Sequence, residues 1–147
     1  MCDQDFENRG DLVPEETVLF RGCSSSNFLS KPNRDSVRDR AFLKDGARHP
    51  DGMSLGFTMI DSVRDLRENH GAVSILVRDI YTAAASVGIA VEVRYDLSDR
   101  EHHARIHNMP CKNRAQEERD ALNFAEQLAK RAQVASPNPI VIAQEQP

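Results

Sequence analysis

Short stretches of apolar residues at strand spacing are spread over most of the chain. The first of them, residues 17–21, ends at Gly22, a residue type that interrupts strands. Residues 72–78 are apolar at nearly every position, which is typical of a strand covered on both faces. The last two alternate apolar and polar side chains and are joined by a polar turn, so they are predicted to form a hairpin. The predicted strands are residues 17–21, 53–57, 72–78, 89–95 and 103–109.

Three other stretches have apolar residues at helical spacing. The first begins at a pair that resembles a capping box, Thr58 with Asp61, and is predicted to end before Gly71. A shorter helix is predicted to follow Asp79, which can cap it. The predicted helices are residues 58–70, 80–87 and 114–133.

The longest predicted helix, residues 114–133, has Asn113 as its expected cap. One of its faces carries a stripe of apolar side chains, most of them alanines. Because small side chains let a helix pack close to a sheet, this face is predicted to meet the core. Leu122, Ala125 and Leu128 are predicted to be among the residues that face it.

These elements together predict one domain of the α+β class. The expected sheet is mixed but mostly antiparallel, with about five to six strands, and it packs against two longer helices and a short one. The length of 147 residues is that of a single domain. The predicted organisation is a flexible N-terminal arm at 1–14, the domain at 15–135 and a proline-containing tail at 136–147.

Composition and charge exclude several classes of function. The formal net charge is −4, and basic and acidic residues are interleaved between Lys31 and Arg48, so nucleic acid is not expected as a partner. No apolar run approaches the roughly 20 residues of a membrane span, and the first residues are acidic, unlike a secretory signal. The three cysteines, Cys2, Cys23 and Cys111, are widely spaced and are predicted to be free thiols in a cytoplasmic protein.

The histidines near the predicted hairpin are the first candidates for chemistry. His102, His103 and His107 stand among acidic residues, as the ligands of metal sites often do. On a strand, however, His103 and His107 would lie about 13 Å apart and could not bind one ion. No metal and no cofactor are therefore predicted. Cys23 and Cys111 show no base that the sequence places beside them, so a packed or incidental thiol is their expected role.

A guanidinium, a hydroxyl and an imidazole stand on or beside three of the predicted strands. These ligand-binding candidates are Arg21, Ser54 and His103. We predict that they line one cleft beside the long segment 23–52, where they would suit a phosphate or carboxylate ligand.

The stretches around these residues resemble the ADP-ribosyltransferase fold. The similar fragments are residues 19–22, 51–57, 73–77 and 106–110. The resemblance implies that Arg21 and Ser54 hold a nicotinamide dinucleotide. It also implies a glutamate on the last core strand, but this sequence has His103 and Arg105 there. An arginine would repel the cation that develops on the ribose, so the resemblance implies the fold more strongly than the transferase activity.

Segments 51–54 and 103–110 also resemble those of small uncharacterised bacterial proteins, which implies a bacterial source and no particular activity. The leading prediction is therefore a cytoplasmic binding or regulatory module that acts through a protein partner or an anionic small ligand. Its expected contact surfaces are the long loop 23–52 and the apolar triplet 140–142, which is predicted to dock as an edge strand. The alternative is an enzyme that acts on a nucleotide.

Overall fold

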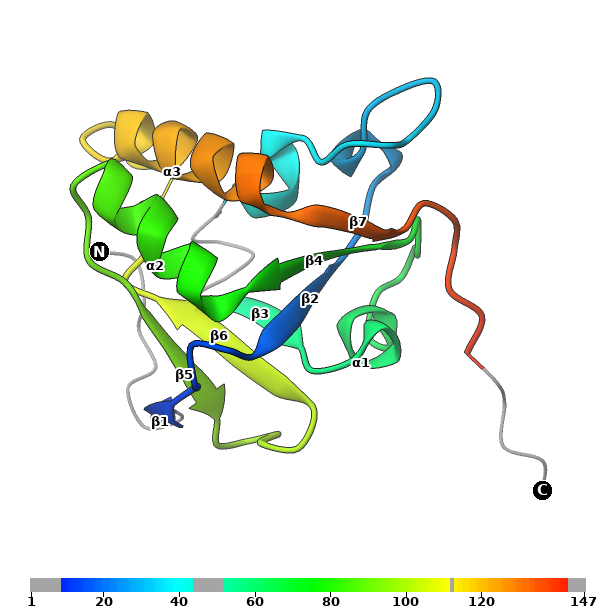
Figure 1. Ribbon diagram of the computed structural model, residues 1–147, viewed down its shortest axis with the longest axis horizontal. Coiled ribbons are helices and arrows are strands. Elements are labelled where there is room, and N and C mark those ends of the chain that lie inside the picture. Colours follow the sequence, from blue (N-terminus) through cyan, green and yellow to red (C-terminus); the bar gives the residue numbers. More distant parts are fainter. Residues whose placement is uncertain (1–8, 44–51, 112, 143–147) are drawn as a thin grey trace.

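Seven strands form one antiparallel sheet in the computed structural model, which describes residues 9–43, 52–111 and 113–142. Their order across the sheet is β1-β5-β6-β3-β2-β4-β7 (Figure 1). The predicted α+β class is confirmed, but the sheet has more strands than the five to six expected, and all its pairings are antiparallel. The strands are β1 (Arg9–Leu12), β2 (Val18–Gly22), β3 (Met53–Gly56), β4 (Ala72–Leu76), β5 (Glu92–Asp96), β6 (His103–His107) and β7 (Gln133–Ser136).

The helices differ from the predicted ones mainly in length. Thr58 does cap the first, because its Oγ1 accepts a hydrogen bond from the Asp61 N–H at 3.0 Å. That helix nevertheless ends at Val63, so the predicted extent of 58–70 is wrong. The helices are α1 (Met59–Val63), α2 (Val77–Ser86) and α3 (Glu118–Arg131), with the 3₁₀ helices η1 (Ser26–Phe28) and η2 (Asp39–Phe42) in the loop after β2.

The second helix, α2, begins three residues earlier than predicted. The Val77 and Arg78 N–H groups donate to the carbonyls of Thr17 and Glu15, each at 2.9 Å. These bonds satisfy donors that a helix start leaves open, so Asp79 lies in the first turn and is not the cap. The third helix, α3, begins at Glu118, and Asn113 does not cap it.

The core lies between the sheet and the two longer helices, α2 and α3, which cover the same face (Figure 1). The buried residues of α3 are Ala121, Phe124, Ala125 and Leu128, the spacing of one helical face. Ala125 and Leu128 are thus buried as predicted, with an exposed fraction of 0%. Leu122 is 42% exposed, so the prediction is wrong for this residue, which lies one step around the helix from Ala121.

The short helix α1 packs against the opposite face, over β2 and β3. Two glycines allow this close approach. A Cβ at Gly22 would stand 2.1 Å from the Ser62 carbonyl oxygen, and one at Gly56 would stand 2.5 Å from the Ser62 nitrogen. The backbone of α1 therefore rests directly on the backbone of the sheet.

Part of the predicted N-terminal arm belongs to the sheet. Residues Arg9–Leu12 pair with β5 as strand β1, and Val13 is 3% exposed with its N–H bonded to the Val93 carbonyl at 2.9 Å. The prediction of a flexible arm at 1–14 is wrong for these residues. A strand can pair through its backbone without a long apolar run. Because this segment has no such run, its sequence did not predict strand β1. Phe6, the large apolar residue of this segment, lies outside the described residues.

The end of the domain also differs from the prediction. Residues 133–136 leave α3 as strand β7, which pairs with β4. The triplet 140–142 forms no strand. Instead the Asn69 side chain donates to the Ile140 carbonyl at 2.7 Å and accepts from the Ile140 N–H at 3.1 Å. A side-chain amide thus takes the place of a neighbouring strand at Ile140.

The cysteines are not all free thiols. Cys23 is free and buried, as predicted, but Cys111 is disulfide-bonded. Residues far apart in the sequence can be close in space, so the wide spacing of the cysteines was not sufficient to predict a free thiol at Cys111. Cys2 lies outside the described residues. Because disulfides are typical of oxidising compartments, Cys111 lends no support to the predicted cytoplasmic location.

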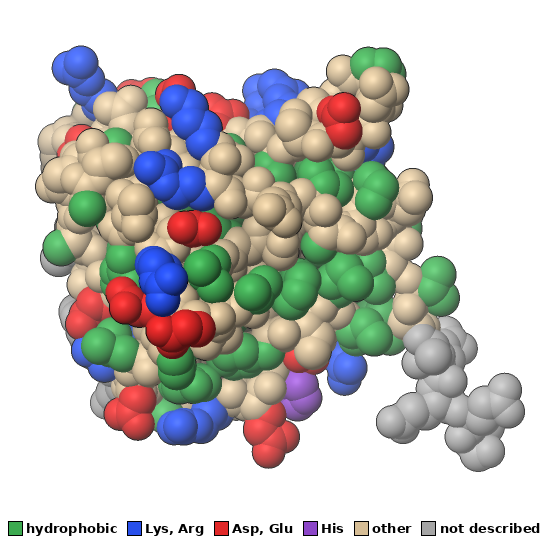
Figure 2. All heavy atoms as spheres, in the orientation of Figure 1, with side chains coloured by type: hydrophobic (Ala, Val, Ile, Leu, Met, Phe, Trp, Pro, Cys, Tyr) green, Lys and Arg blue, Asp and Glu red, His purple; other side chains and the backbone are tan. Residues whose placement is uncertain are grey.

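The surface mixes charged and apolar side chains. Figure 2 shows acidic and basic groups interspersed over α2 and α3, with apolar side chains gathered beside them over β4, β2 and α1. Val18, Met59 and Ile60 are among the exposed apolar residues. In the described part of the chain, no helix combines the length and apolar character needed to cross a membrane.

Candidate functional site

The three candidate residues from different strands line one cavity. Arg21, Ser54 and His103 all border a space of about 120 Å³ between α1 and the adjoining strands β2, β3 and β6. Their convergence follows from the register, because Gly56 pairs with His103 in the β3–β6 ladder. The remaining lining residues are Leu55, Gly56, Asp61, Ser62, Asp65 and Leu66.

The guanidinium of Arg21 is directed away from the other two side chains. Side chains alternate between the faces of a strand, and Gly22 faces α1, so Arg21 points to the opposite face. There its Nε donates to the Ala41 carbonyl at 3.1 Å and its Nη1 to the Ser54 carbonyl at 3.2 Å. Burial lowers the pKa of Arg21 to about 10, with a smaller opposing effect of Cys23, so it stays charged at neutral pH. Its hydrogen bonds hold η2 to the sheet.

Both ring nitrogens of His103 are occupied. Nδ1 lies 2.7 Å from the Asp99 carboxylate, and Nε2 lies 2.9 Å from the Asp61 carbonyl oxygen. Because both partners are acceptors, His103 makes both hydrogen bonds only when each nitrogen carries a hydrogen. It thereby ties the β5–β6 turn to α1.

The Asp99 carboxylate is shared with a second imidazole. His102 Nδ1 lies 2.7 Å from Asp99 Oδ1. Hydrogen bonds from His102 and His103 lower the pKa of Asp99, outweighing partial desolvation. The same hydrogen bond is the largest cause that raises the pKa of His102, and the charge of Asp61 contributes further.

Four oxygen-bearing side chains complete the cavity wall. Ser62 Oγ donates to the Met59 carbonyl at 2.6 Å, which leaves its lone pairs available. The Ser54 hydroxyl and the Asp61 carboxylate form no hydrogen bond within the described part of the chain. Asp61 is only 7% exposed, whereas Asp65 is exposed at the cavity mouth. The groups left for a ligand are thus mainly hydrogen-bond acceptors, so the geometry does not favour the anion expected there.

Arg105 lies next to the cavity and is neutralised by a buried partner. Its Nε donates to Asp96 Oδ2 at 2.8 Å, and Asp96 is 2% exposed. Burial alone would raise the pKa of Asp96, but hydrogen bonds from Ser98 and Arg105 outweigh it and hold the pKa below its ordinary value. The strand pairings place Arg105 beside Ser54 and Arg94. The arginine that stands where the resemblance implies a glutamate is therefore part of a structural ion pair.

His103 and His107 lie on one strand, as predicted. His107 is 1% exposed, near the far end of β6 from His103. Within the described ranges, no three His, Cys, Asp or Glu side chains come close enough together to hold a metal ion.

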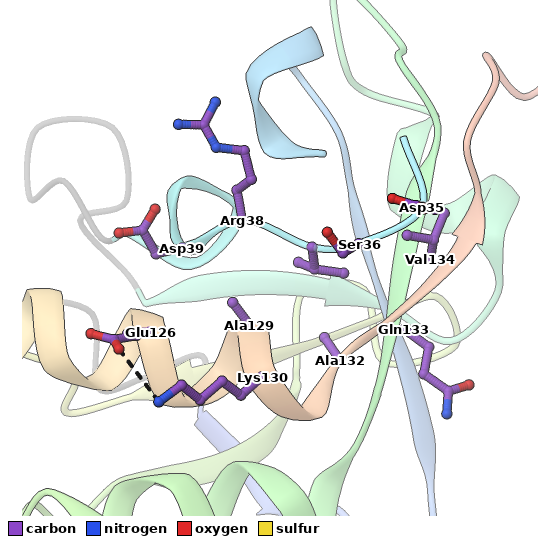
Figure 3. Close-up of a pocket in the computed structure, with 11 residues that line it drawn as sticks. Asp35, Ser36, Arg38, Asp39, Glu126, Ala129, Lys130, Ala132, Gln133 and Val134 are labelled. Carbon is purple, nitrogen blue, oxygen red and sulfur yellow. Dashed lines mark ion pairs between the residues drawn. The ribbon is translucent and has the colours of Figure 1, made fainter. Parts of the chain in front are cut away.

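A larger hollow lies elsewhere, where the long loop meets α3 and β7. This loop groove has a volume of about 580 Å³ and is lined by residues 35–39, Glu126, Ala129, Lys130, Ala132, Gln133 and Val134. Figure 3 shows Ala129 of α3 and Ala132, the residue after this helix, pointing toward the loop segment. The sequence singled out this loop as a contact surface, but no pattern in it identified α3 and β7 as the opposite wall.

Two acidic residues of the site were not predicted to bind a ligand. Asp61, which lines the cavity, was interpreted as part of a helix start, and Asp99, which bonds His103, as part of a turn and as one of the acidic residues around the histidines. Both are acidic residues within five positions of a candidate or a cap, but that signal is too common to identify a site. Comparison with known proteins adds no candidate function: no protein-family model matches the chain, and neither a curated protein nor a solved structure matches it.

Proposed function

We propose that this protein is a binding module that holds an extended segment of a partner protein in the loop groove. The observation that carries the proposal is the groove itself, formed by the loop after β2 against α3 and β7. Its volume is within the roughly 300–1,000 Å³ range of ligand pockets. Loops held against a rigid scaffold are common binding surfaces.

The lining residues favour a segment that carries both apolar and basic side chains. Val37, Ala129, Ala132 and Val134 provide apolar contacts in the groove. Among the charged lining residues, Lys130 and Glu126 pair with each other at 3.4 Å.

The other charged residues of the groove are Asp35, Asp39 and Arg38, which leave an excess of one negative charge. Asp35 Oδ1 accepts a hydrogen bond from Ser30 Oγ at 3.0 Å, which fixes its place at the rim. A basic residue in the bound segment would complement this excess.

Site-specific photocrosslinking in cells tests the proposal. A photoreactive residue in place of Ser36, in the groove, is expected to capture a defined protein segment. The same residue in place of Thr82, exposed on α2, is the matched control. Equal capture from both positions would contradict the proposal.

The captured segment is then synthesised as a peptide and its affinity measured by calorimetry. Reversing two rim charges, Asp35→Lys with Asp39→Lys, is expected to weaken binding about tenfold or more, because like charges then meet. Asp120→Lys with Glu118→Lys reverses two charges in the first turn of α3, outside the groove, and should leave the affinity unchanged.

A second candidate is an enzyme that acts on a nucleotide. It is favoured by one observation, that Arg21, Ser54 and His103 line the same cavity, although a space of about 120 Å³ would take only one polar group of a nucleotide. The resemblance to the ADP-ribosyltransferase fold implies that Arg21 and Ser54 hold a nicotinamide dinucleotide. Arg105 stands where the resemblance implies a glutamate and supplies no carboxylate to stabilise a cation on the ribose, which counts against transferase chemistry. Native-state binding of NAD would raise the melting temperature. The melting temperature is measured with NAD and with other nucleotides, and no rise with any of them at millimolar concentration rejects this candidate.

A further inference from the structure

The cavity under α1 is a separate site from the loop groove, and its chemistry is different. Its volume of about 120 Å³ is a few times the roughly 30 Å³ that a water molecule takes in the liquid. It can take one small polar group but no whole nucleotide. A Cβ at Gly56 would clash with Ser62. Position 56 therefore contributes only backbone to the cavity wall.

Asp61 places a carboxylate on the cavity wall, on a residue that is itself largely buried. Its exposed fraction is 7%, and in the described chain its carboxylate has neither a hydrogen bond nor an ion pair. A buried carboxylate is costly unless a donor or cation compensates it. The imidazole of His102 feels this charge, but its Nδ1 already bonds Asp99 at 2.7 Å.

The rest of the wall does not supply the missing donor. Both nitrogens of His103 are engaged, and Ser62 Oγ donates to the Met59 carbonyl. The Arg21 guanidinium bonds carbonyls on the opposite face of the sheet. Only the Ser54 hydroxyl retains a hydrogen to donate toward the cavity.

We infer that this cavity binds the protonated amino or guanidino group of a small molecule, with Asp61 as the counter-charge and Ser54 and Ser62 as hydrogen-bond partners. An organic cation brings several donors to a wall of acceptors. The inference goes beyond the proposed function, because it concerns a different site and a different class of ligand.

Nuclear magnetic resonance titration with methylguanidinium chloride and methylammonium chloride tests this inference at constant ionic strength. At least one of the two cations is expected to shift the amide signals of Ser54, Ser62 and His103 in a saturable way. Sodium acetate, the anionic counterpart, should shift none of them. Shifts that do not saturate, shifts spread over the surface, or saturable binding of acetate would overturn the inference.

Two variants show whether Asp61 is the counter-charge. Asp61→Asn keeps the size of the side chain and is expected to weaken cation binding about tenfold or more. Asp79→Asn, in the first turn of α2, is the matched control and should bind as the wild type does. If Asp61→Asn bound the cation with wild-type affinity, the inference would be wrong.

If Asp61→Asn does not fold, Ser54→Ala decides in its place, because it removes a hydroxyl without burying or exposing a charge. It should weaken binding severalfold, and an unchanged affinity overturns the inference. None of these variants touches the loop groove, so failure here leaves the proposed function to its own test.

Discussion

Leu128 is the residue at which burial has its clearest expected effect on stability. It is completely buried on α3, so Leu128→Ala should lower the free energy of unfolding by about 2 to 5 kcal/mol. Leu122→Ala, on the same helix but 42% exposed, is the matched control and should cost well under half as much. Urea unfolding measures both. Equal losses would show that α3 does not pack as described.

Gly22 has no room for a side chain. Its ideal Cβ would lie 2.1 Å from a backbone oxygen of α1, so Gly22→Ala must displace that helix. We expect a loss of about 1 to 3 kcal/mol or more in the free energy of unfolding. Gly88→Ala is a control for backbone strain, because its position is open but has a φ of +75°. If Gly88→Ala lowered the free energy of unfolding more than Gly22→Ala does, the close contact between Gly22 and α1 would be refuted.

Single residues show what sequence can and cannot predict. The burial of Leu128 was predictable because helical periodicity identifies the apolar face of α3. Leu122 lies at the edge of that face, where burial depends on how the helix packs against its neighbours. The gathering of Ser54 and His103 was predictable in outline from their strands. The direction of the Arg21 side chain, toward η2 and away from α1, depends on which face Gly22 presents to α1, and the sequence does not reveal the position of α1.

At the scale of elements, the β5–β6 turn should make stability depend on pH. The pKa of Asp99 lies below its ordinary value of 3.8, so its contribution is present above that value and is lost as the pH falls through its folded pKa. The pKa of His102 lies above 6.5, so its contribution is present below 6.5 and is lost as the pH rises through its folded pKa.

Both contributions are therefore present between pH 3.8 and 6.5. Asp99→Asn should lower the urea midpoint most within this window and less on either side. The profile of each protein is measured from pH 3 to 9 in steps of about half a unit. A constant difference at all pH values would mean that the ion pairs of this turn do not form.

The elements that sequence missed are short edge strands. β1 and β7 have four residues each and join the sheet through backbone hydrogen bonds, for which the sequence gives no apolar pattern. The other five strands, among them the equally short β3, were predictable because burial requires apolar side chains at alternate positions. α1 ends early because the chain turns after Val63, where Leu66 N–H bonds the Val63 carbonyl at 3.0 Å.

At the scale of the whole molecule, the N-terminal segment should contribute to stability, whereas a flexible arm at 1–14 would be expected to contribute little. Val13 is buried and β1 covers the edge of β5. Val13→Ala should cost about 1 to 3 kcal/mol, and removal of residues 1–13 should cost more. Exposed Val18→Ala, at 47% exposure, is the control. An unchanged melting temperature after the truncation would instead support a flexible N-terminal arm that adds nothing to stability.

The order of the strands also fixes when each part of the chain can fold during synthesis. β2 emerges early, but its partners β3 and β4 follow only after long intervening stretches, and β1 pairs with β5, which is made later still. Such distant pairings slow folding to roughly milliseconds to seconds, because long loops must close first. The nascent chain therefore carries unpaired strand edges until the later partners are made, and α3 and β7 are the last elements of the domain to emerge.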